Sequence, residues 1–267
     1  MAFRGLGEWY NNVVKKIIFS DYDGTIYTRD GGVAENVQAI KRWHEAGGKF
    51  VIATGRGFTS AKDAAGEYGI PFDYVIMNNG ALIADSEWNL ISELTVDSTT
   101  AQEIRQFIEH NFRDLVEGFY YYGLGSKSSE PMGVITKIRV QTKGRDHEPM
   151  LRIANAVNHT FPDVIAHATT TDMYALEQFP DANYQIVDIV GVRAGKERAI
   201  ELVLEREGLT ADDVVTVGDG ANDAEMIERY DGYAIRGTMV DAMTDSKTTT
   251  SVGALIDELM GATDSPA

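Results

Sequence analysis

The sequence predicts an α/β protein in which a parallel-sheet core is interrupted by an inserted α+β domain. Three observations predict this class. Uniformly apolar strand-like runs alternate with helix-like segments near the N-terminus, the same alternation returns near the C-terminus, and the strand-like runs between them alternate apolar and polar residues. Strands buried on both faces are uniformly apolar, whereas alternation indicates one solvent-facing side. We therefore expect a Rossmann-like core at residues 1–81 and 188–267, and an insert at 82–187 whose sheet exposes one face.

The N-terminal part of the core is predicted as strand, helix, strand, helix, strand. Its strands are short apolar runs that stop at polar residues or glycine, and its first helix repeats apolar residues at helical spacing until two glycines end it. The expected strands are 16–20, 50–53 and 74–77, and the expected helices are 34–46 and 58–68. Strands that alternate with helices in this way are typical of parallel sheets covered on both faces.

The same signals continue through the insert and the C-terminal part. A hairpin is expected at 81–94, because Asp85-Ser86-Glu87 has the composition of a turn. In the insert we expect helices at 98–112 and 147–159, and strands at 115–122, 134–142, 163–169, 173–178 and 184–190. In the C-terminal part we expect helices at 196–207, 222–229 and 252–260, and strands at 214–217 and 233–235. Residues 262–267 have the composition of a loose polar tail.

Composition limits the classes of function. The chain has 267 residues, no cysteine and a formal net charge of −17. The missing cysteine excludes disulfides, thiolate metal sites and cysteine nucleophiles. The acidic charge disfavours nucleic acid and anionic lipid as partners, and no run approaches the roughly 18 apolar residues of a membrane helix. We therefore expect a cytoplasmic protein that binds neither nucleic acid nor membrane, while its oligomeric state cannot be predicted.

Polar residues and glycines follow three of the predicted core strands. The three segments are Asp21-Tyr22-Asp23-Gly24-Thr25, Thr54-Gly55-Arg56 and Gly218-Asp219-Gly220-Ala221-Asn222-Asp223. Ligands of open parallel sheets bind outside the carboxyl ends of the strands, so these segments are expected to converge. Carboxylates gathered there would repel one another without a cation, and magnesium takes oxygen ligands. An aspartate can also form a covalent phosphoryl intermediate.

Each segment has a simpler structural interpretation when it is taken alone. Residues Asp21–Thr25 can form a turn closed by aspartate hydrogen bonds, and Thr54–Arg56 can be a strand-to-helix turn. Asn222 or Asp223 can cap the next helix, and Lys196, at the start of a predicted helix, can be a solvated side chain. The occurrence of all these segments together and in order favours a single phosphate and metal site.

These segments resemble the motifs of the haloacid dehalogenase superfamily, and of its Cof-type phosphatase branch in particular. They occur in the family's order, with Asp21–Thr25 first, Thr54 second, Lys196 third and Gly218–Asp223 fourth. The resemblance covers nearly the whole chain, and the insert stands where this branch carries an α/β cap domain. It implies a hydrolase, namely a magnesium-dependent phosphatase. Such an enzyme would act on a small phosphorylated metabolite, either a sugar phosphate or a cofactor phosphate, through an aspartyl phosphate.

The resemblance also implies a role for each matching residue. Asp21 would be the nucleophile, and Asp23 would protonate the leaving oxygen and then activate water. Magnesium would be held by Asp21, the backbone carbonyl of Asp23, Asp219 and Asp223, the last of these directly or through water. The phosphate or substrate would be held by Thr54, Gly55, Arg56, Lys196 and Asn222.

Two alternative functions remain open at this point. A phosphomutase uses the same aspartyl phosphate but passes the phosphoryl group to a second hydroxyl, and a non-catalytic protein with this fold would only bind a phosphorylated ligand. Tyr22 departs from the family pattern, which has an aliphatic residue there, and its side chain is expected to point away from the site. In the cap, Lys137, Arg139, His167 and the aromatic run 119–122 are candidate substrate contacts, although strands that alternate between core and surface explain them more simply.

Overall fold

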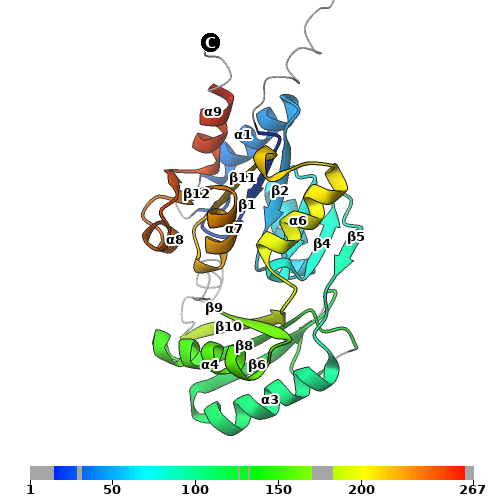
Figure 1. Cartoon of the computed structure of the whole chain (residues 1–267), viewed down its shortest axis with the longest axis vertical. Coiled ribbons are helices and arrows are strands. Elements are labelled where there is room, and N and C mark those ends of the chain that lie inside the picture. The colour runs from blue at the N-terminus through cyan, green and yellow to red at the C-terminus, as the bar shows by residue number, and fades with distance from the viewer. Residues whose placement is uncertain (1–14, 29–31, 126, 132, 170–182, 262–267) are drawn as a thin grey trace, which may run out of the picture.

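A computed structural model describes residues 15–28, 32–125, 127–131, 133–169 and 183–261 of the chain. The strand expected at 173–178 and the tail expected at 262–267 lie outside the described residues. The described residues form two sheets, each with its own helices, and the two units follow one another along the long axis of the molecule (Figure 1). The predicted α/β class with a mainly parallel core sheet is confirmed. None of the helices in these ranges is long and apolar enough to span a membrane.

The larger sheet is mostly parallel and has β1 near its centre. Its order is β13-β12-β11-β1-β2-β3-β4-β5, and only the last two strands pair antiparallel. The bounds are β1 (Ile17–Ser20), β2 (Lys49–Ala53), β3 (Tyr74–Met77), β4 (Leu82–Asp85), β5 (Leu90–Glu93), β11 (Val214–Gly218), β12 (Asp231–Ile235) and β13 (Lys247–Thr249). β1, β2 and β11 are almost wholly buried, as expected for apolar strands that are covered on both faces.

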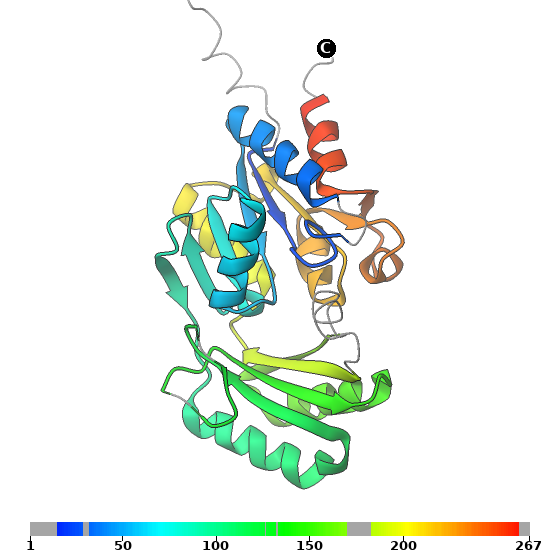
Figure 2. The same ribbon diagram turned by 180° about the vertical axis from the view of Figure 1, so that it is seen from behind.

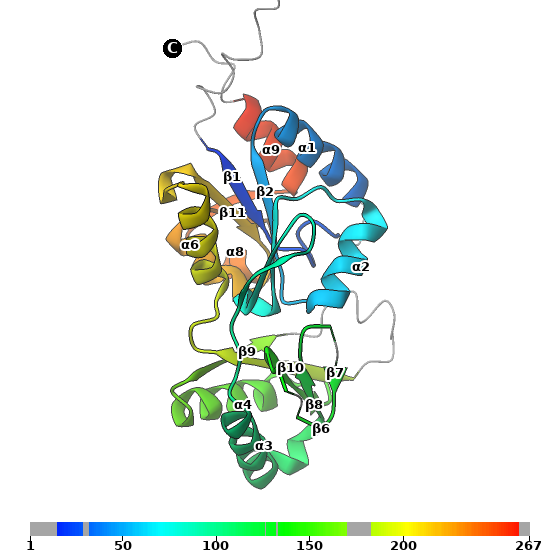
Figure 3. The same ribbon diagram turned by 90° about the vertical axis from the view of Figure 1, so that its right-hand side faces the viewer.

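Helices cover both faces of this sheet, as Figures 2 and 3 show from behind and from the side. One face carries α1 (Val33–Glu45), α2 (Phe58–Tyr68) and α9 (Val252–Gly261), the other carries α6 (Lys196–Glu207) and α7 (Ala224–Arg229), and α8 (Met239–Met243) follows β12. Each face has its own buried cluster, because successive strand residues point to opposite sides. Ile18 joins the α1 side, whereas Ile17 and Phe19 join the α6 side. With both faces covered, a ligand can reach this sheet only at its strand ends.

The smaller sheet is antiparallel, in the order β7-β6-β8-β10-β9. Its elements are α3 (Ser98–Phe112), β6 (Val116–Tyr122), β7 (Lys127–Ser128), β8 (Lys137–Lys143), α4 (His147–Thr160), β9 (Val164–Thr169) and β10 (Tyr184–Gly191). Alternation gives this sheet one apolar face, where Tyr121, Ile138 and Val187 belong to a buried cluster shared with α3 and α4. Asp97 and Asp146 begin these helices by accepting hydrogen bonds from backbone amides.

The opposite face of the smaller sheet is polar and turns toward the larger sheet. Arg139, Asp188 and His167 are neighbours in one cross-strand row of this face. Lys137, two residues before Arg139, lies on the same face, and its Nζ donates a hydrogen bond to the carbonyl of Gly55 at 2.8 Å. Lys137 and Asp188 are each only 1% exposed. The prediction that this face is exposed is therefore wrong at Lys137 and Asp188, which are buried where the face meets the loop after β2, whereas Arg139 and His167 are half-buried.

Buried charges on this face are paired. The guanidinium of Arg139 donates from Nε and Nη2 to the two carboxylate oxygens of Asp188, at 2.7 and 2.8 Å, and Lys137 Nζ lies 3.3 Å from Asp188 Oδ2. Burial alone would raise the pKa of Asp188, but the two cations outweigh it and lower that pKa to about 2. Asp188 thus neutralises the lysine that joins the smaller sheet to the loop after β2.

The hairpin at β4 and β5 corrects one boundary. The sequence predicts that the insert begins at residue 82, but β4 pairs with β3 and its first three residues are buried in the larger sheet. At the other end, residues 188–191, predicted as core, belong to β10 of the smaller sheet. Among the described residues, the short strands β7 and β13 and the short helix α8 were also missed. The division of the chain into two domains stays a prediction.

Replacing Asp188 tests the buried pairing. Asp188→Asn removes the buried carboxylate that both Lys137 and Arg139 contact, so we expect the free energy of unfolding to fall by about 3–5 kcal/mol. Urea unfolding at neutral pH measures it. Asp163→Asn is the matched control, because Asp163 is exposed, and a surface change of this kind shifts stability by no more than about 0.5 kcal/mol. Equal unfolding midpoints for the two variants would contradict the role given to Asp188.

Candidate active site

Three neighbouring strands of the larger sheet deliver the predicted residues to one place. β11, β1 and β2 lie side by side and run parallel. Asp21 follows β1, Thr54 follows β2, and Asp219 follows β11. Because parallel strands end at the same edge of a sheet, residues separated by up to two hundred positions meet there. The order of the strands in the sheet therefore brings the three segments together, as expected.

Three carboxylates form a cluster at this edge. Asp21, Asp219 and Asp223 each contribute one oxygen, and these oxygens lie within 4.8 Å of one another. Asp21 is 5% exposed and Asp223 is fully buried. Thr25, at the end of the first segment, donates its hydroxyl to Asp219 Oδ1 at 3.0 Å. The cluster therefore combines residues of the segment after β1 with residues of the segment after β11.

The ammonium of Lys196 lies between two of these carboxylates. Its Nζ donates to Asp21 Oδ1 at 2.5 Å and to Asp223 Oδ1 at 2.6 Å. Lys196 is the first residue of α6 and is 2% exposed. Burial alone would lower the pKa of Lys196, but the charges of Asp21 and Asp223 outweigh it and hold that pKa above its usual value. The lysine is therefore a fixed cation in the cluster, and not a solvated side chain.

Asp223 holds the loop after β11 in shape. Its Oδ1 accepts the Lys196 ammonium, and its Oδ2 accepts the backbone amides of Asp219 at 3.1 Å and Gly220 at 2.9 Å. Both oxygens of this carboxylate are thus engaged within the protein. The arrangement orients Asp219 and Lys196 and leaves Asp223 as the most enclosed member of the cluster.

Asp23 forms a two-point ion pair with Arg56. The guanidinium donates from Nε to Asp23 Oδ2 at 2.8 Å and from Nη2 to Asp23 Oδ1 at 2.6 Å. The Tyr22 ring lies beneath the same guanidinium, 4.7 Å from its carbon to the ring centroid, and is buried. Tyr22 points away from the carboxylate cluster, as predicted, but it supports the side chain that orients Asp23. A guanidinium fork fixes a carboxylate in direction as well as position.

The loop after β2 lies close to two asparagines. Thr54 is buried, and its Oγ1 accepts the backbone amide of Arg56 at 3.1 Å. A Cβ added to Gly55 would stand 2.9 Å from Asn79 Oδ1, so only glycine fits there without a shift. Asn222 donates from Nδ2 to the same Asn79 oxygen at 3.4 Å. Asn79 thus joins the segments after β2 and β11.

The carboxylate cluster is suited to a hard divalent cation. Burial raises the pKa of Asp21 well above its usual value, and the neighbouring carboxylates reinforce this against the opposing charge of Lys196. Burial, followed by the charge of Asp223, raises the pKa of Asp219 to about 7. The donor atoms are all oxygens, which hard cations prefer. A bound cation would relieve the repulsion that raises these pKa values.

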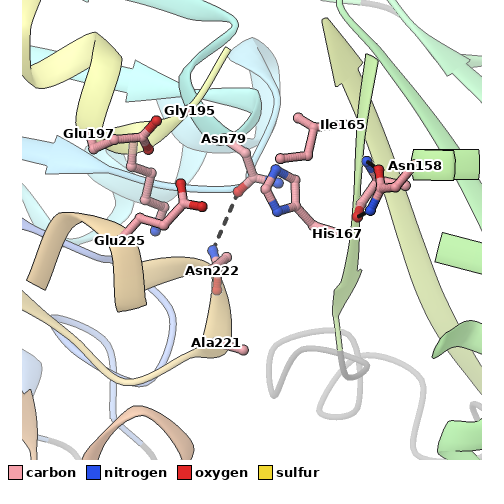
Figure 4. A pocket seen from close by; sticks show the side chains of 11 residues that line it. Asn79, Asn158, Ile165, His167, Gly195, Glu197, Ala221, Asn222 and Glu225 are labelled. Carbon is pink, nitrogen blue, oxygen red and sulfur yellow. Dashed lines mark hydrogen bonds between the residues drawn. The ribbon is translucent and has the colours of Figure 1, made fainter. Parts of the chain in front are cut away.

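A cavity of about 110 Å³ adjoins the cluster (Figure 4). It lies between β9 of the smaller sheet and the first turns of α6 and α7, and it contains residues that were not predicted as functional: Asn158, Glu197 and Glu225. No signal in the sequence could have identified them. Polar residues on helices are ordinarily solvent-facing, and Asn158 and Glu225 remain exposed although they line this cavity.

Comparison with known proteins gives consistent relatives. A family model described as haloacid dehalogenase-like hydrolase matches residues 18–238. A 5-amino-6-(5-phospho-D-ribitylamino)uracil phosphatase of Bacillus subtilis is 24% identical, with 80% of this chain and 84% of that protein covered. A phosphoglycolate phosphatase of Methanopyrus kandleri is 24% identical, with 79% and 80% covered. The structure of a haloacid dehalogenase-like hydrolase from B. subtilis superposes with a TM-score of 0.73 at 17% identity, covering 92% of this chain and 99% of that one.

Replacing Gly24 tests how tightly the two segments pack. Gly24 has φ +85°, and a Cβ there would stand 2.2 Å from Asp219 Oδ2. We expect Gly24→Ala to lower the free energy of unfolding by about 1–3 kcal/mol, because it adds left-handed strain and displaces the half-buried carboxylate of Asp219. Chemical denaturation measures the change.

Gly66→Ala in α2 is the matched control. Gly66 lies within the helix, and an added Cβ there meets nothing within 4 Å. This substitution is expected to raise stability by about 0.5–1 kcal/mol, because alanine loses less backbone entropy in a helix. If both glycine substitutions shifted stability in the same direction, the close packing of Gly24 against Asp219 would be wrong.

Proposed function

We propose a reaction for this chain on one premise: it belongs to the haloacid dehalogenase-like hydrolase family, in its Cof-type branch, and is a phosphoric monoester hydrolase. The proposed reaction is hydrolysis of a small phosphomonoester, with Asp21 as nucleophile and magnesium as cofactor. The observation that carries the proposal is the position of Asp21, which lies at the carboxyl end of the central strand β1 and is fixed there by Lys196 at 2.5 Å.

Asp21 is positioned to attack phosphorus. Lys196 binds its Oδ1, and Oδ2 has no hydrogen-bond partner among the described residues. In the first step a bond forms between this carboxylate and phosphorus while the bond from phosphorus to the ester oxygen breaks, giving an aspartyl phosphate. In the second step water attacks the same phosphorus and the bond to Asp21 breaks, which releases phosphate and restores the carboxylate.

Asp23 transfers the protons in both steps. It gives a proton to the leaving oxygen in the first step and takes one from water in the second. Arg56 was predicted to contact the substrate or phosphate, but its fork binds Asp23 through two hydrogen bonds. We therefore assign Arg56 to positioning Asp23, with Tyr22 supporting the guanidinium from below.

The residues fit a magnesium ion and a phosphoryl group. Magnesium would be held by Asp21, the backbone carbonyl of Asp23, Asp219 and, directly or through water, Asp223. Opposite ligands of octahedral magnesium stand about 4.2 Å apart, close to the 4.8 Å within which the carboxylate oxygens gather. When bound, the ion neutralises these acids and polarises a phosphoryl oxygen. The phosphoryl group would be held by Thr54, the amide of Gly55, Lys196 and Asn222.

The smaller sheet is proposed to act as the cap, over the approximate range 94–191. Its polar face adjoins the carboxyl ends of the core strands, where it would exclude water from the reaction. The named relatives act on different esters, a ribitylaminouracil phosphate in one case and phosphoglycolate in another. Their names therefore support a phosphatase without selecting its substrate.

Removing the nucleophile tests the reaction. Asp21→Asn is expected to lower phosphate release from p-nitrophenyl phosphate at least about a thousandfold, because the amide cannot form the covalent intermediate. Asp63→Asn, an exposed aspartate on α2, is the control and should turn over as the wild type does. Undiminished turnover by Asp21→Asn would remove Asp21 from the mechanism. Phosphate transfer to an added sugar, without net release, would indicate a mutase instead.

Magnesium binding is expected to depend on pH. Because the pKa of Asp219 is about 7 without a cation, protons compete with the metal below neutral pH, and apparent affinity should be at least about tenfold weaker at pH 6 than at pH 8. The pKa of Asp219 is higher in the folded protein than in the unfolded chain. Without metal, the free energy of unfolding should therefore fall as the pH rises from about 4 to about 7. Calorimetric titration with magnesium at both pH values measures the affinity.

Asp219→Asn provides the control for that titration. This variant should bind magnesium more weakly than the wild type, and its pH dependence should be smaller because the group that competes for the proton is gone. Wild-type affinity that is constant between pH 6 and pH 8 would be inconsistent with Asp219 as a ligand.

A further inference from the structure

The cavity beside the carboxylate cluster has walls from both sheets (Figure 4). Lys196, Asn79 and Asn222 form the part that adjoins the reaction centre. β9 supplies the opposite wall through Ile165 and His167. At about 110 Å³ the cavity is small beside the roughly 300–1,000 Å³ of pockets for drug-sized ligands. A group bound there would be directly next to a phosphoryl group held at Lys196.

The wall from the smaller sheet presents one unsatisfied polar atom. His167 Nε2 is buried and has no hydrogen-bond partner among the described residues. Asn158, beside it, is already satisfied, because its amide exchanges two hydrogen bonds with the backbone of Ala166, at 2.7 and 3.0 Å. Burial lowers the pKa of His167, so the imidazole is neutral at physiological pH. Buried polar atoms nearly always have a hydrogen-bond partner, and a group bound in the cavity can supply one to His167 Nε2.

The wall from the larger sheet is acidic. Glu197 and Glu225 lie in the first turns of α6 and α7 and line the cavity, and Figure 4 shows both carboxyl groups on the same side, opposite His167. Burial, followed by the neighbouring charge of Glu225, raises the pKa of Glu197. Arg198 Nε lies 3.8 Å from Glu197 Oε1, and the Arg198 side chain is 56% exposed.

Among the described residues that line the cavity, no free cation offsets this acidic wall. Lys196 is the basic residue that lines it, and its ammonium is already shared between Asp21 and Asp223. An anionic group in the cavity would therefore face two carboxylates without a counter-charge. A hydroxyl group, by contrast, donates to a carboxylate and accepts from, or donates to, a neutral imidazole.

We propose that this cavity binds the leaving group of the substrate and selects an uncharged, hydroxyl-bearing one, with His167 as its partner on the cap side and Glu197 and Glu225 as the acceptors that exclude anions. This inference rests on the proposed phosphatase function. It adds the chemical class of the ester: a small polyol phosphate is accepted, and a phosphate ester that also carries a carboxylate is rejected.

Two esters of equal size separate these classes. Glycerol 3-phosphate and 3-phosphoglycerate differ in one position, a hydroxymethyl group in the first and a carboxylate in the second. The full-length wild type with magnesium should favour glycerol 3-phosphate by at least about tenfold in kcat/KM, because the carboxylate of 3-phosphoglycerate would be repelled by Glu197 and Glu225. The double variant Glu197→Gln/Glu225→Gln should bring the ratio of the two kcat/KM values close to one. Glu205→Gln, an exposed position on the same helix α6, should leave the wild-type ratio.

His167→Leu tests the other wall. It should lower kcat/KM for glycerol 3-phosphate by up to about tenfold, as expected when one neutral hydrogen bond is lost, and should lower it less for 3-phosphoglycerate. His167→Gln, which keeps a polar end, should restore part of the loss. Equal loss for both esters, or a wild-type ratio that survives the double glutamate substitution, would overturn the proposal.

Binding separates this proposal from the proposed function. In Asp21→Asn, where a bound ester is not consumed, calorimetry with magnesium should show glycerol 3-phosphate binding more tightly than 3-phosphoglycerate, and the added glutamate substitutions should remove the difference. If the wild type hydrolyses neither ester but this preference is found, the reaction is wrong for these esters and the selectivity stands. If both esters are hydrolysed and bound alike, the reaction stands and the selectivity is wrong.

Discussion

The gathering of three carboxylates beside one ammonium, with Asp21 and Asp223 buried and Asp219 half-buried, is the constraint on which the rest of the site depends. Asp21, Asp219 and Asp223 lie together in a poorly solvated place, which raises the pKa values of Asp21 and Asp219 and would favour their neutral forms. Lys196 compensates only part of this charge, since one ammonium serves two of the acids. The remaining repulsion is what a bound divalent cation would relieve. The positions of Gly24 and Thr25 follow from it, because both pack against Asp219.

A second charged group links the smaller sheet to this site. Lys137 is neutralised by Asp188 within the cap and donates to the carbonyl of Gly55, the residue that follows Thr54. The cap is further joined to the core by a hydrogen bond of 2.9 Å from Asn78 to Thr136. The smaller sheet thus contacts the loop after β2, which we propose to bind phosphate, and a movement of that sheet would change the environment of the loop.

The core strands and most of the site were predictable, and the exceptions have physical reasons. Strands covered on both faces leave uniformly apolar runs, so β1, β2, β3 and β11 were found from composition alone. The residues at their ends were predictable because parallel strands bring them to one edge.

β13 and α8 were missed, since elements of three and five residues carry too little periodicity to recognise. The hairpin was assigned to the insert because its own sequence does not show which strand it pairs with. The pairing of Arg56 with Asp23, and the acidic wall of Glu197 and Glu225, depend on side-chain packing between distant segments.

Covalent trapping at Asp21 is the most direct test of the mechanism. The enzyme would be quenched in acid during turnover of a phosphoester with magnesium and treated with borohydride, which reduces an acyl phosphate on aspartate to the alcohol of homoserine. Peptide mass spectrometry would then locate the modified residue. The mechanism predicts homoserine at position 21, an unmodified Asp23, and no reduction when the ester is omitted. Modification at another aspartate, or none at all while phosphate is still released, would contradict it.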